Sequence, residues 1–292
     1  MALRRLRTWW WALLLAAVMV WDFGSAMAVP ATPDEPAATI PASGPIFLLF
    51  MGSDARPGQH VLRQRSDVML LVGINREKRR ATILEFNRDT WVPIRDHGHN
   101  RINAAMAFGG PSLAVRTVTA VSGIPIHAWL VTTFPGFTRM VDLVGGMDVD
   151  VPFAMYDINS GAAFEPGWQR LSGSDSLAFV RDRHGVPESV NTRTRNQGRF
   201  ARHSLEQYQV EIRKDPDRMQ DWIGAGTSNM RTNLSLGQIA KLAGLAARIP
   251  ASRVNLVLVP NRPGFVGEHE IVFLTAAAKP LFADMRRDGV IG

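Results

Sequence analysis

The sequence of 292 residues contains no cysteine. This absence excludes disulfide bonds, thiolate catalysis and zinc sites built on cysteine. It fits a protein of an export compartment without requiring one.

Several common catalytic motifs are missing as well. The chain has no G-x-S-x-G nucleophile elbow, no phosphate-binding loop ending in Gly-Lys-Ser/Thr and no H-E-x-x-H zinc motif. Gly224-Ala225-Gly226 begins like a dinucleotide fingerprint but lacks the third glycine. The seven histidines are scattered and are not expected to bind a metal. The sequence therefore does not point to an α/β-hydrolase, a P-loop enzyme or a zinc protease.

An apolar run near the N-terminus is shorter than a typical membrane span. Arginines precede the run from Trp9 to Trp21, which as a helix would reach about 20 Å, against about 30 Å of hydrocarbon. With the small residues before Ala28, this predicts that residues 1–28 are a signal peptide; the alternative is an uncleaved signal anchor. Either form predicts that the rest of the chain is exported, at the outer face of the cytoplasmic membrane or secreted to the periplasm or cell wall.

The body carries an excess of positive charge. The formal net charge is +7, which suits an anionic partner such as nucleic acid, a phospholipid surface or a phosphorylated substrate. Charge alone does not choose among these partners.

Apolar patterns divide the chain into a linker and a folded body. Residues 29–45 contain five prolines and predict an extended linker. From residue 46 to 292, short apolar runs alternate with helical patterns, which predicts an α/β or α+β domain with one main sheet. The expected strands are Ile46–Met51, Val68–Ile74, Ala81–Phe86, 127–133, 147–152 and 254–260. The expected helices are Asn103–Phe108, Pro111–Ser122, Phe134–Val144, Ser174–Asp182, Gln197–Lys214 and Ser235–Ala247.

Arginines gather in one stretch of the second half of the sequence. The stretch from Arg181 to Arg202 has six arginines and only two acidic residues. Such crowding favours an anionic ligand, because guanidinium groups bind phosphate oxygens in pairs. On a helix, Arg199, Arg202 and His203 would share one face. The alternative is a solvated, flexible basic loop.

Two aspartates flank the loop between the first two predicted strands. Asp54 follows the first strand and Asp67 precedes the second. If these strands pair, the carboxylates lie close together, and one or two carboxylates with phosphate and water suit Mg²⁺. The alternative is that they form ordinary ion pairs with Arg56 and Arg65.

Eight sequence segments together resemble the LytR-CpsA-Psr family of exported cell-wall ligases. They are LLFMGSDARP, RSDVMLLVGIN, NRDTWVPI, NRINAAMAFGG, VDLVGGMDVDVP, LSGSDSLAFVRDR, GRFARH and TNLSLGQIAKLA. They follow the family's order from about residue 46 to residue 250. Each segment is weakly specific, and the ordered set is strongly specific.

The resemblance implies a fold and a reaction. The implied fold is an α/β/α sandwich with a mixed central sheet and an apolar channel for a polyprenyl tail. The implied activity is that of a phosphotransferase dependent on Mg²⁺ or Mn²⁺. Such an enzyme moves a glycopolymer from undecaprenyl diphosphate to a peptidoglycan hydroxyl and releases undecaprenyl phosphate.

The resemblance also assigns site residues. Asp54 and Asp67 correspond to the metal-associated aspartates, and Arg88 and Asp89 are the expected catalytic residues. Asp89 would hold the side chain of Arg88 or act as base toward the acceptor hydroxyl. The expected diphosphate-binding residues are Arg65, Arg88, Arg101, Arg181, Arg183, Arg199, Arg202 and His203.

Some positions depart from the family pattern. Asn87 stands where the family usually has proline, and Arg101 where it usually has lysine. The family usually has an acidic residue three positions before the arginine matched to Arg199 and a glutamine four positions after it; here these are Asn196 and His203. The departures leave open an altered substrate or reduced transfer activity.

The sequence does not separate channel lining from ordinary core. Candidate lining residues are Phe137, Val141, Leu177, Phe200 and Leu205. The alternative function is a non-catalytic envelope protein that binds polyprenyl diphosphate or anionic polymer. A nucleic-acid partner is not expected, because the N-terminal segment predicts export.

Overall fold

The computed structural model describes residues 36–183 and 189–292. The predicted signal segment (1–28) and the first part of the predicted linker lie outside these residues. Within the described ranges, no helix is long and apolar enough to span a membrane. The later part of the predicted linker contacts the body, because Ala38 N donates a hydrogen bond to Asn233 O at 2.9 Å.

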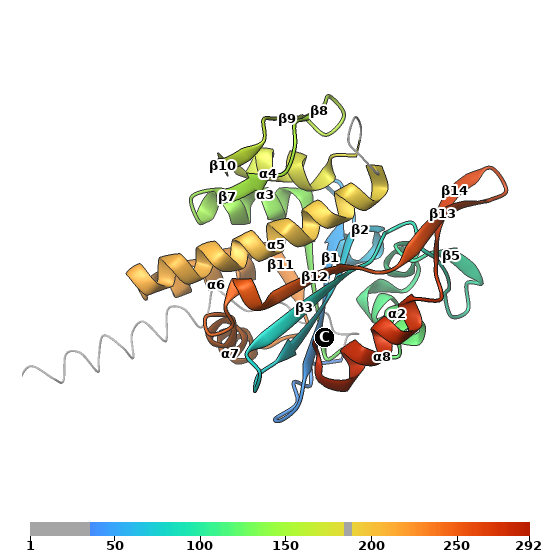
Figure 1. The fold of residues 1–292 in the computed structure, drawn as a ribbon, viewed down its shortest axis with the longest axis horizontal. Helices are drawn as coiled ribbons and strands as arrows, with labels where there is room; N and C mark the ends of the chain where they lie inside the picture. Colours follow the sequence, from blue (N-terminus) through green and yellow to red (C-terminus); the bar gives the residue numbers. More distant parts are fainter. Residues whose placement is uncertain (1–35, 184–188) are drawn as a thin grey trace, which may run out of the picture.

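The described residues form strands β1 to β14 and helices α2 to α8 (Figure 1). The strands are β1 (Ile46–Ser53), β2 (Ser66–Asn75), β3 (Arg80–Glu85), β4 (Trp91–Pro93), β5 (His99–Arg101), β6 (Ala128–Thr133), β7 (Met147–Val151), β8 (Met155–Asp157), β9 (Ala162–Phe164), β10 (Gly167–Leu171), β11 (Met230–Thr232), β12 (Val254–Leu258), β13 (Asn261–Val266) and β14 (His269–Leu274). The helices are α2 (Ala104–Ser122), α3 (Phe134–Leu143), α4 (Gly173–Arg181), α5 (Ser189–Lys214), α6 (Arg218–Asn229), α7 (Leu236–Ala246) and α8 (Ala278–Asp288).

The central sheet has six strands in the order β11-β6-β1-β2-β3-β12. β1 pairs with β2 antiparallel and with β6 parallel, and β3 pairs with β2 antiparallel and with β12 parallel. This confirms the predicted mixed central sheet. It also confirms that the three apolar runs after the linker are neighbouring strands.

Alternating side chains of the central strands pack on two helical layers. Phe47 and Leu49 of β1 belong to a core that includes residues of α2 and α8. Leu70 of β2 packs on the opposite face, in a cluster that includes Leu205 of α5 and Leu245 of α7. Figure 1 shows α2 and α8 on one side of the sheet and α5 and α7 on the other. Because a strand's side chains alternate between faces, both faces of this sheet need an apolar cover.

A smaller unit packs beside α5. β7 pairs with β10, and this two-stranded sheet shares a core with α3 and α4 that includes Val149 and Phe179. In Figure 1 this unit lies on the other side of α5 from β3 and β12. Helix α5 thus separates the smaller unit from that edge of the central sheet.

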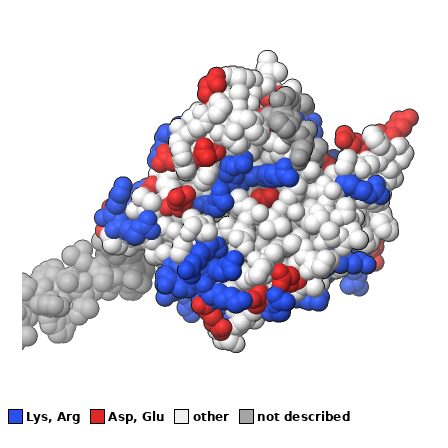
Figure 2. Space-filling view, viewed as in Figure 1, with Lys and Arg blue, Asp and Glu red and all other residues white. Residues whose placement is uncertain are grey.

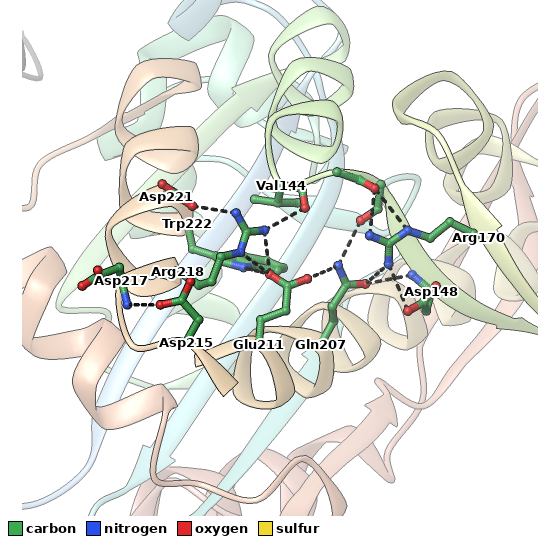
Figure 3. A network of polar contacts seen from close by, with 12 residues as sticks. Val144, Asp148, Arg170, Gln207, Glu211, Asp215, Asp217, Arg218, Asp221 and Trp222 are labelled. Atoms are coloured by element: carbon green, nitrogen blue, oxygen red, sulfur yellow. Dashed lines mark hydrogen bonds and ion pairs between the residues drawn. The ribbon is translucent and has the colours of Figure 1, made fainter. Parts of the chain in front are cut away.

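Polar contacts fix the C-terminal half of α5 to its neighbours (Figure 3). Glu211 accepts hydrogen bonds from Trp222 Nε1 at 2.9 Å and from Arg218 Nη2 at 2.8 Å, both on α6. Gln207 accepts one from the backbone N of Asp148 in β7 at 2.9 Å. These bonds hold α6 and β7 against α5.

Some elements differ from those expected from the sequence. Helix α5 begins at Ser189 rather than Gln197, so its first turns contain Arg193 and Arg195, which lay outside the expected helix. The two helices expected around residue 110 form the single element α2, which is kinked because Gly110 has φ 68° before Pro111. Helices α6 and α8 and the β13–β14 hairpin have no counterpart among the expected elements.

Candidate functional site

A large cavity lies between the central sheet and the helices α3, α5, α6 and α7. Its volume is about 760 Å³, and most of its lining is apolar. Leu48, Leu70 and Ile83 contribute from the sheet. The five residues named from the sequence as candidate channel lining, Phe137, Val141, Leu177, Phe200 and Leu205, all line it. A cavity of this volume is within the range that binds organic ligands.

Charged residues gather on one part of the cavity wall. Asp67 lies at the start of β2, and Arg88 lies in the loop that follows β3. The Asp67 Oδ1 atom is 2.5 Å from Arg88 Nη1, and both residues line the cavity. This ion pair joins the central sheet to the loop that carries Asp89.

Asp89 contacts three arginines. Its carboxylate oxygens lie 3.4 Å from Arg88 Nε, 3.5 Å from Arg101 Nε and 3.9 Å from Arg193 Nη2. The Asn87 Oδ1 atom accepts a hydrogen bond from Asp89 N at 3.0 Å, which fixes the turn. Burial lowers the pKa of Arg88, but the carboxylates of Asp67 and Asp89 outweigh it and raise that pKa. These contacts suit a carboxylate that orients arginine side chains.

Arg193 is a deeply buried cation in the cavity wall, and the sequence reasoning did not select it as a site residue. It is 5% exposed, and its Nε has no hydrogen-bond partner among the described residues. Burial, together with the nearby charge of Arg88, lowers the pKa of Arg193 to about 10. Because an arginine remains charged at neutral pH even so, Arg193 brings an incompletely neutralised positive charge to the cavity.

Gln197 lies one helical turn after Arg193 and also lines the cavity. Its Nε2 donates to the backbone oxygens of Val180 at 3.2 Å and Asp67 at 3.4 Å. Residues four apart lie on the same face of a helix. Arg193 and Gln197 therefore form one polar strip on the inner face of α5.

Arg181 and Arg183 line the cavity at the end of α4, where both are exposed. Helix α4 begins with a capping box between Ser172 and Asp175, which fixes its first turn. Arg181 is the last residue of this helix. The Arg181 guanidinium carbon lies 4.8 Å from the centre of the Phe134 ring. This cation–π contact holds the guanidinium group of Arg181 beside Phe134.

Asp54 and Arg65 lie close to Asp67 without lining the cavity. Asp54 N donates a hydrogen bond to Arg65 O at 3.1 Å. Burial, followed by the negative charge of Asp67, raises the pKa of Asp54. The Oδ1 atom of Asp54 is buried and has no hydrogen-bond partner among the described residues.

The two aspartates fit a divalent cation that takes further ligands from elsewhere. No group of three or more His, Cys, Asp or Glu in the described ranges forms a metal site by itself. Two mutually repelling carboxylates, one with an unpartnered buried oxygen, are nevertheless a suitable donor set for Mg²⁺, which keeps waters and substrate phosphates as ligands.

Besides Asp54, Arg65 and Asp89, four more predicted site residues lie outside the cavity lining. Arg101 contacts Asp89 and donates from Nη2 to Glu270 O at 2.9 Å. The other three, Arg199, Arg202 and His203, follow Arg193 along α5 but lie on other faces of the helix. Arg199 donates from Nη1 to Asn196 Oδ1 at 2.8 Å.

The fold and the site define an α/β protein with an apolar cavity whose wall carries arginines and carboxylates. The chain belongs to the LytR_cpsA_psr family, whose model matches residues 22–279. This confirms the family resemblance of the sequence segments.

Curated relatives include named teichoic acid transferases. One, polyisoprenyl-teichoic acid–peptidoglycan teichoic acid transferase TagU of Enterococcus faecalis, is 28% identical over 68% of this chain and 65% of its own length. Another, the transferase TagT of Bacillus subtilis, is 32% identical over 49% of this chain and 47% of its own length. The matched part of this chain thus spans less than two thirds of either relative.

Solved structures share the fold. The structure of TagT bound to LI-WTA has a TM-score of 0.69 and 20% identity, covering 88% of this chain and 96% of that one. The LytR-Csp2A-Psr enzyme from Actinomyces oris has a TM-score of 0.70 and 23% identity, with coverage of 88% and 96%. At these identities the likeness concerns the fold alone.

Proposed function

We propose that this protein is a phosphotransferase that moves a glycopolymer from undecaprenyl diphosphate to a hydroxyl of peptidoglycan. The observation that carries the proposal is the position of Asp67, Arg88 and Arg193 on the wall of a large apolar cavity. A ligand with a long hydrocarbon tail suits the apolar lining of this cavity, and a phosphorylated head group suits its arginines. Family membership and the named activities of the relatives support the same substrate class.

The polyprenyl tail occupies the cavity in this proposal. The tail is held by apolar burial against the inner faces of β1, β2 and α5, where Leu48, Leu70 and Phe200 line the cavity. Such contacts require no particular polar geometry, and they leave the arginines to orient the head group.

The diphosphate is held by Arg88, Arg193, Arg181 and Arg183, which all line the cavity. In the family pattern, a glutamine follows an arginine by four positions. The sequence resemblance matches these two positions to Arg199 and His203. Arg193 and Gln197 have the same spacing and the expected residue types. We assign that pattern to Arg193 and Gln197, six residues earlier. Arg65 and Arg101 stay as predicted contacts at the edge of the site.

Asp54 and Asp67 would hold Mg²⁺ or Mn²⁺ beside the diphosphate. When bound, the cation would neutralise charge on the phosphate oxygens. The protein's own cations supply the same kind of stabilisation, because Arg88 and Arg193 face the region where negative charge grows on the leaving group. Asp89 Oδ2 keeps these two arginine side chains oriented, because it lies 3.4 Å from Arg88 Nε and 3.9 Å from Arg193 Nη2.

In the proposed reaction, the acceptor hydroxyl oxygen attacks the phosphorus that bears the glycopolymer. The bond between this phosphorus and the bridging oxygen breaks, and undecaprenyl phosphate leaves with that oxygen. The acceptor loses its proton and the product is a phosphodiester. This chemistry needs a donor and an acceptor outside the cytoplasmic membrane, in agreement with the export predicted from residues 1–28.

Transfer can be measured with the purified chain, a radiolabelled lipid-linked glycopolymer and a peptidoglycan acceptor. The proposal predicts label in peptidoglycan and release of undecaprenyl phosphate in equal amounts. Tight binding of the donor without any transfer would contradict the enzymatic assignment and support a non-catalytic binding protein instead.

A further inference from the structure

Helix α5 carries a second polar surface outside the cavity. Arg193, Gln197 and Phe200 face the cavity, whereas Arg199 and Arg202 do not line it. At 100° per residue, Arg202 lies about half a turn around the helix from Arg193. Figure 2 shows lysine and arginine side chains gathered over α5 on the face turned to the viewer. We call Arg199, Arg202, His203 and Trp168 the outer α5 surface.

The positive charge of the outer α5 surface is only partly neutralised by the buried carboxyl that lies under α5. Glu85 of β3 lies under α5, is 1% exposed and packs against Gly198, where a Cβ atom would collide with its carboxyl. Burial raises the pKa of Glu85 to about 8, although the charges of Arg195, Arg199 and Arg202 act to lower it. At neutral pH this carboxyl is therefore mostly protonated and contributes little negative charge.

Nearby acids do not balance the arginines completely. The exposed Asp150 and Glu206 are the carboxylates that raise the pKa of His203, but burial and the charge of Arg202 outweigh them and lower it. Burial, followed by the charge of Arg202, also lowers the pKa of Arg199. Burial is the larger cause of both shifts, and the charge of Arg202 acts in the same direction, so Arg199, Arg202 and His203 lie close enough to interact.

An exposed aromatic ring borders the arginines. Trp168 of β10 is 63% exposed, and the centre of its ring lies 5.0 Å from that of His203. His203 is 5% exposed, and its Nδ1 has no hydrogen-bond partner among the described residues. A large exposed aromatic ring supported by a buried one is a suitable platform for a ligand with an apolar face. The C–H face of a sugar ring is such a ligand, and guanidinium groups bind phosphate.

We propose that the outer α5 surface binds the phosphate-bearing glycan of the donor, with sugar rings on Trp168 and phosphates at Arg199 and Arg202. This inference rests on the proposed function for the identity of the donor. This surface is separate from the diphosphate clamp, by which we mean Arg88, Arg181, Arg183 and Arg193. Arg193 and the outer α5 surface lie on different faces of α5. It would hold the polymer chain while the lipid diphosphate is bound in the cavity.

The test is direct binding of a lipid-free chain of glycerol phosphate repeats that bear hexose rings to the purified 292-residue protein, measured by titration calorimetry. The variants are the double variant Arg199→Gln/Arg202→Gln and, separately, Trp168→Ala. The matched control is Arg213→Gln/Lys214→Gln, which removes the same charge from the exposed last turn of α5. Uncharged dextran, anionic phospholipid vesicles and a single-stranded oligonucleotide serve as comparison ligands.

We expect both test variants to bind the glycerol phosphate chain at least about tenfold more weakly than wild type, a change of about 1.4 kcal/mol. The control should remain within twofold. Equal losses in the test and control double variants would indicate a general charge effect and overturn the proposal. Tighter binding of vesicles or oligonucleotide than of the glycerol phosphate chain, lost in the same variants, would also overturn it.

A second arm separates this surface from the proposed function. Polyprenyl diphosphate without polymer should bind the Arg199→Gln/Arg202→Gln variant as it binds wild type. Loss of that binding would move these arginines into the diphosphate clamp and overturn the inference. Failure of the wild-type protein to transfer polymer would contradict the proposed function while leaving the measured polymer binding unaffected.

Discussion

The Asp67 Oδ1 atom lies 2.5 Å from Arg88 Nη1, across the gap between β2 and the loop that follows β3. Arg88 also contacts Asp89 through Nε at 3.4 Å. The guanidinium group is therefore held by two carboxylates while it lines the cavity. This arrangement fixes the direction of one cation before any phosphate binds, which is the preorganisation that favours charge stabilisation in a transition state.

Replacing Arg88 tests this preorganised cation. We expect Arg88→Ala to lower the turnover number for polymer transfer at least about 100-fold, because a positioned charge is lost. The radiolabel transfer assay measures it, and circular dichroism checks the fold. The control is Arg95→Ala, because the Arg95 side chain is 76% exposed and pairs with the exposed Asp96. Transfer by Arg88→Ala within twofold of the control would rule out the assigned role.

Arg193 and Arg199 form a matched pair on one helix. We expect Arg193→Gln to weaken binding of polyprenyl diphosphate at least about tenfold, because it removes a buried cation from the cavity wall. Arg199→Gln removes the same charge from the outer α5 surface and should keep this binding. Titration calorimetry with a polyprenyl diphosphate lacking polymer compares the two. The reverse order of effects would restore the original assignment to Arg199.

Metal binding should stabilise the folded protein. A saturating divalent cation raises the free energy of unfolding by about 2.7 kcal/mol at 100 times its dissociation constant. We therefore expect added Mg²⁺ to raise the melting temperature of wild type and chelation to reverse the rise. Asp54→Asn and Asp67→Asn should lose this response, whereas Asp148→Asn, which removes an exposed carboxylate from β7, should keep it. An equal response in all four proteins at constant ionic strength would argue against the aspartate site.

Glu85 predicts a pH dependence of stability. Burial raises its pKa from 4.5 to about 8, so the native state holds the proton more tightly than the unfolded chain. The resulting stabilisation is complete below pH 4.5 and is lost as the pH rises to about 8. Glu85→Gln should therefore gain stability over wild type between pH 5 and pH 8, by at most about 4 kcal/mol. Urea unfolding at several pH values measures the difference, and parallel curves for the two proteins would contradict it.

The strands were predictable because their signal is local. Buried strands such as β1, β2 and β3 require nearly continuous apolar runs, and these runs are visible in the sequence. Asp67 lies at the start of β2 and Arg88 lies soon after the end of β3, so the ends of these strands indicate where both residues lie. The fold class and much of the candidate site could therefore be predicted.

Which face of α5 turns toward the cavity was not predictable from the sequence. The first turns of α5 are rich in arginine, threonine and asparagine, so they lack the apolar periodicity that marks a helix start. Arg193 is buried, and its Nη2 atom lies 3.9 Å from Asp89 in the loop after β3, which is distant in sequence. Burial of Glu85 under Gly198 likewise depends on how α5 crosses the sheet.

The proposed function depends most directly on where a lipid phosphate binds. A crystal structure with a bound polyprenyl phosphate would locate both ends of that ligand. We predict that the tail lies in the cavity between the sheet and α5, with phosphate oxygens within hydrogen-bonding distance of Arg88 and Arg193. A tail outside the cavity, or a phosphate held by Arg199 and Arg202 instead, would contradict the account.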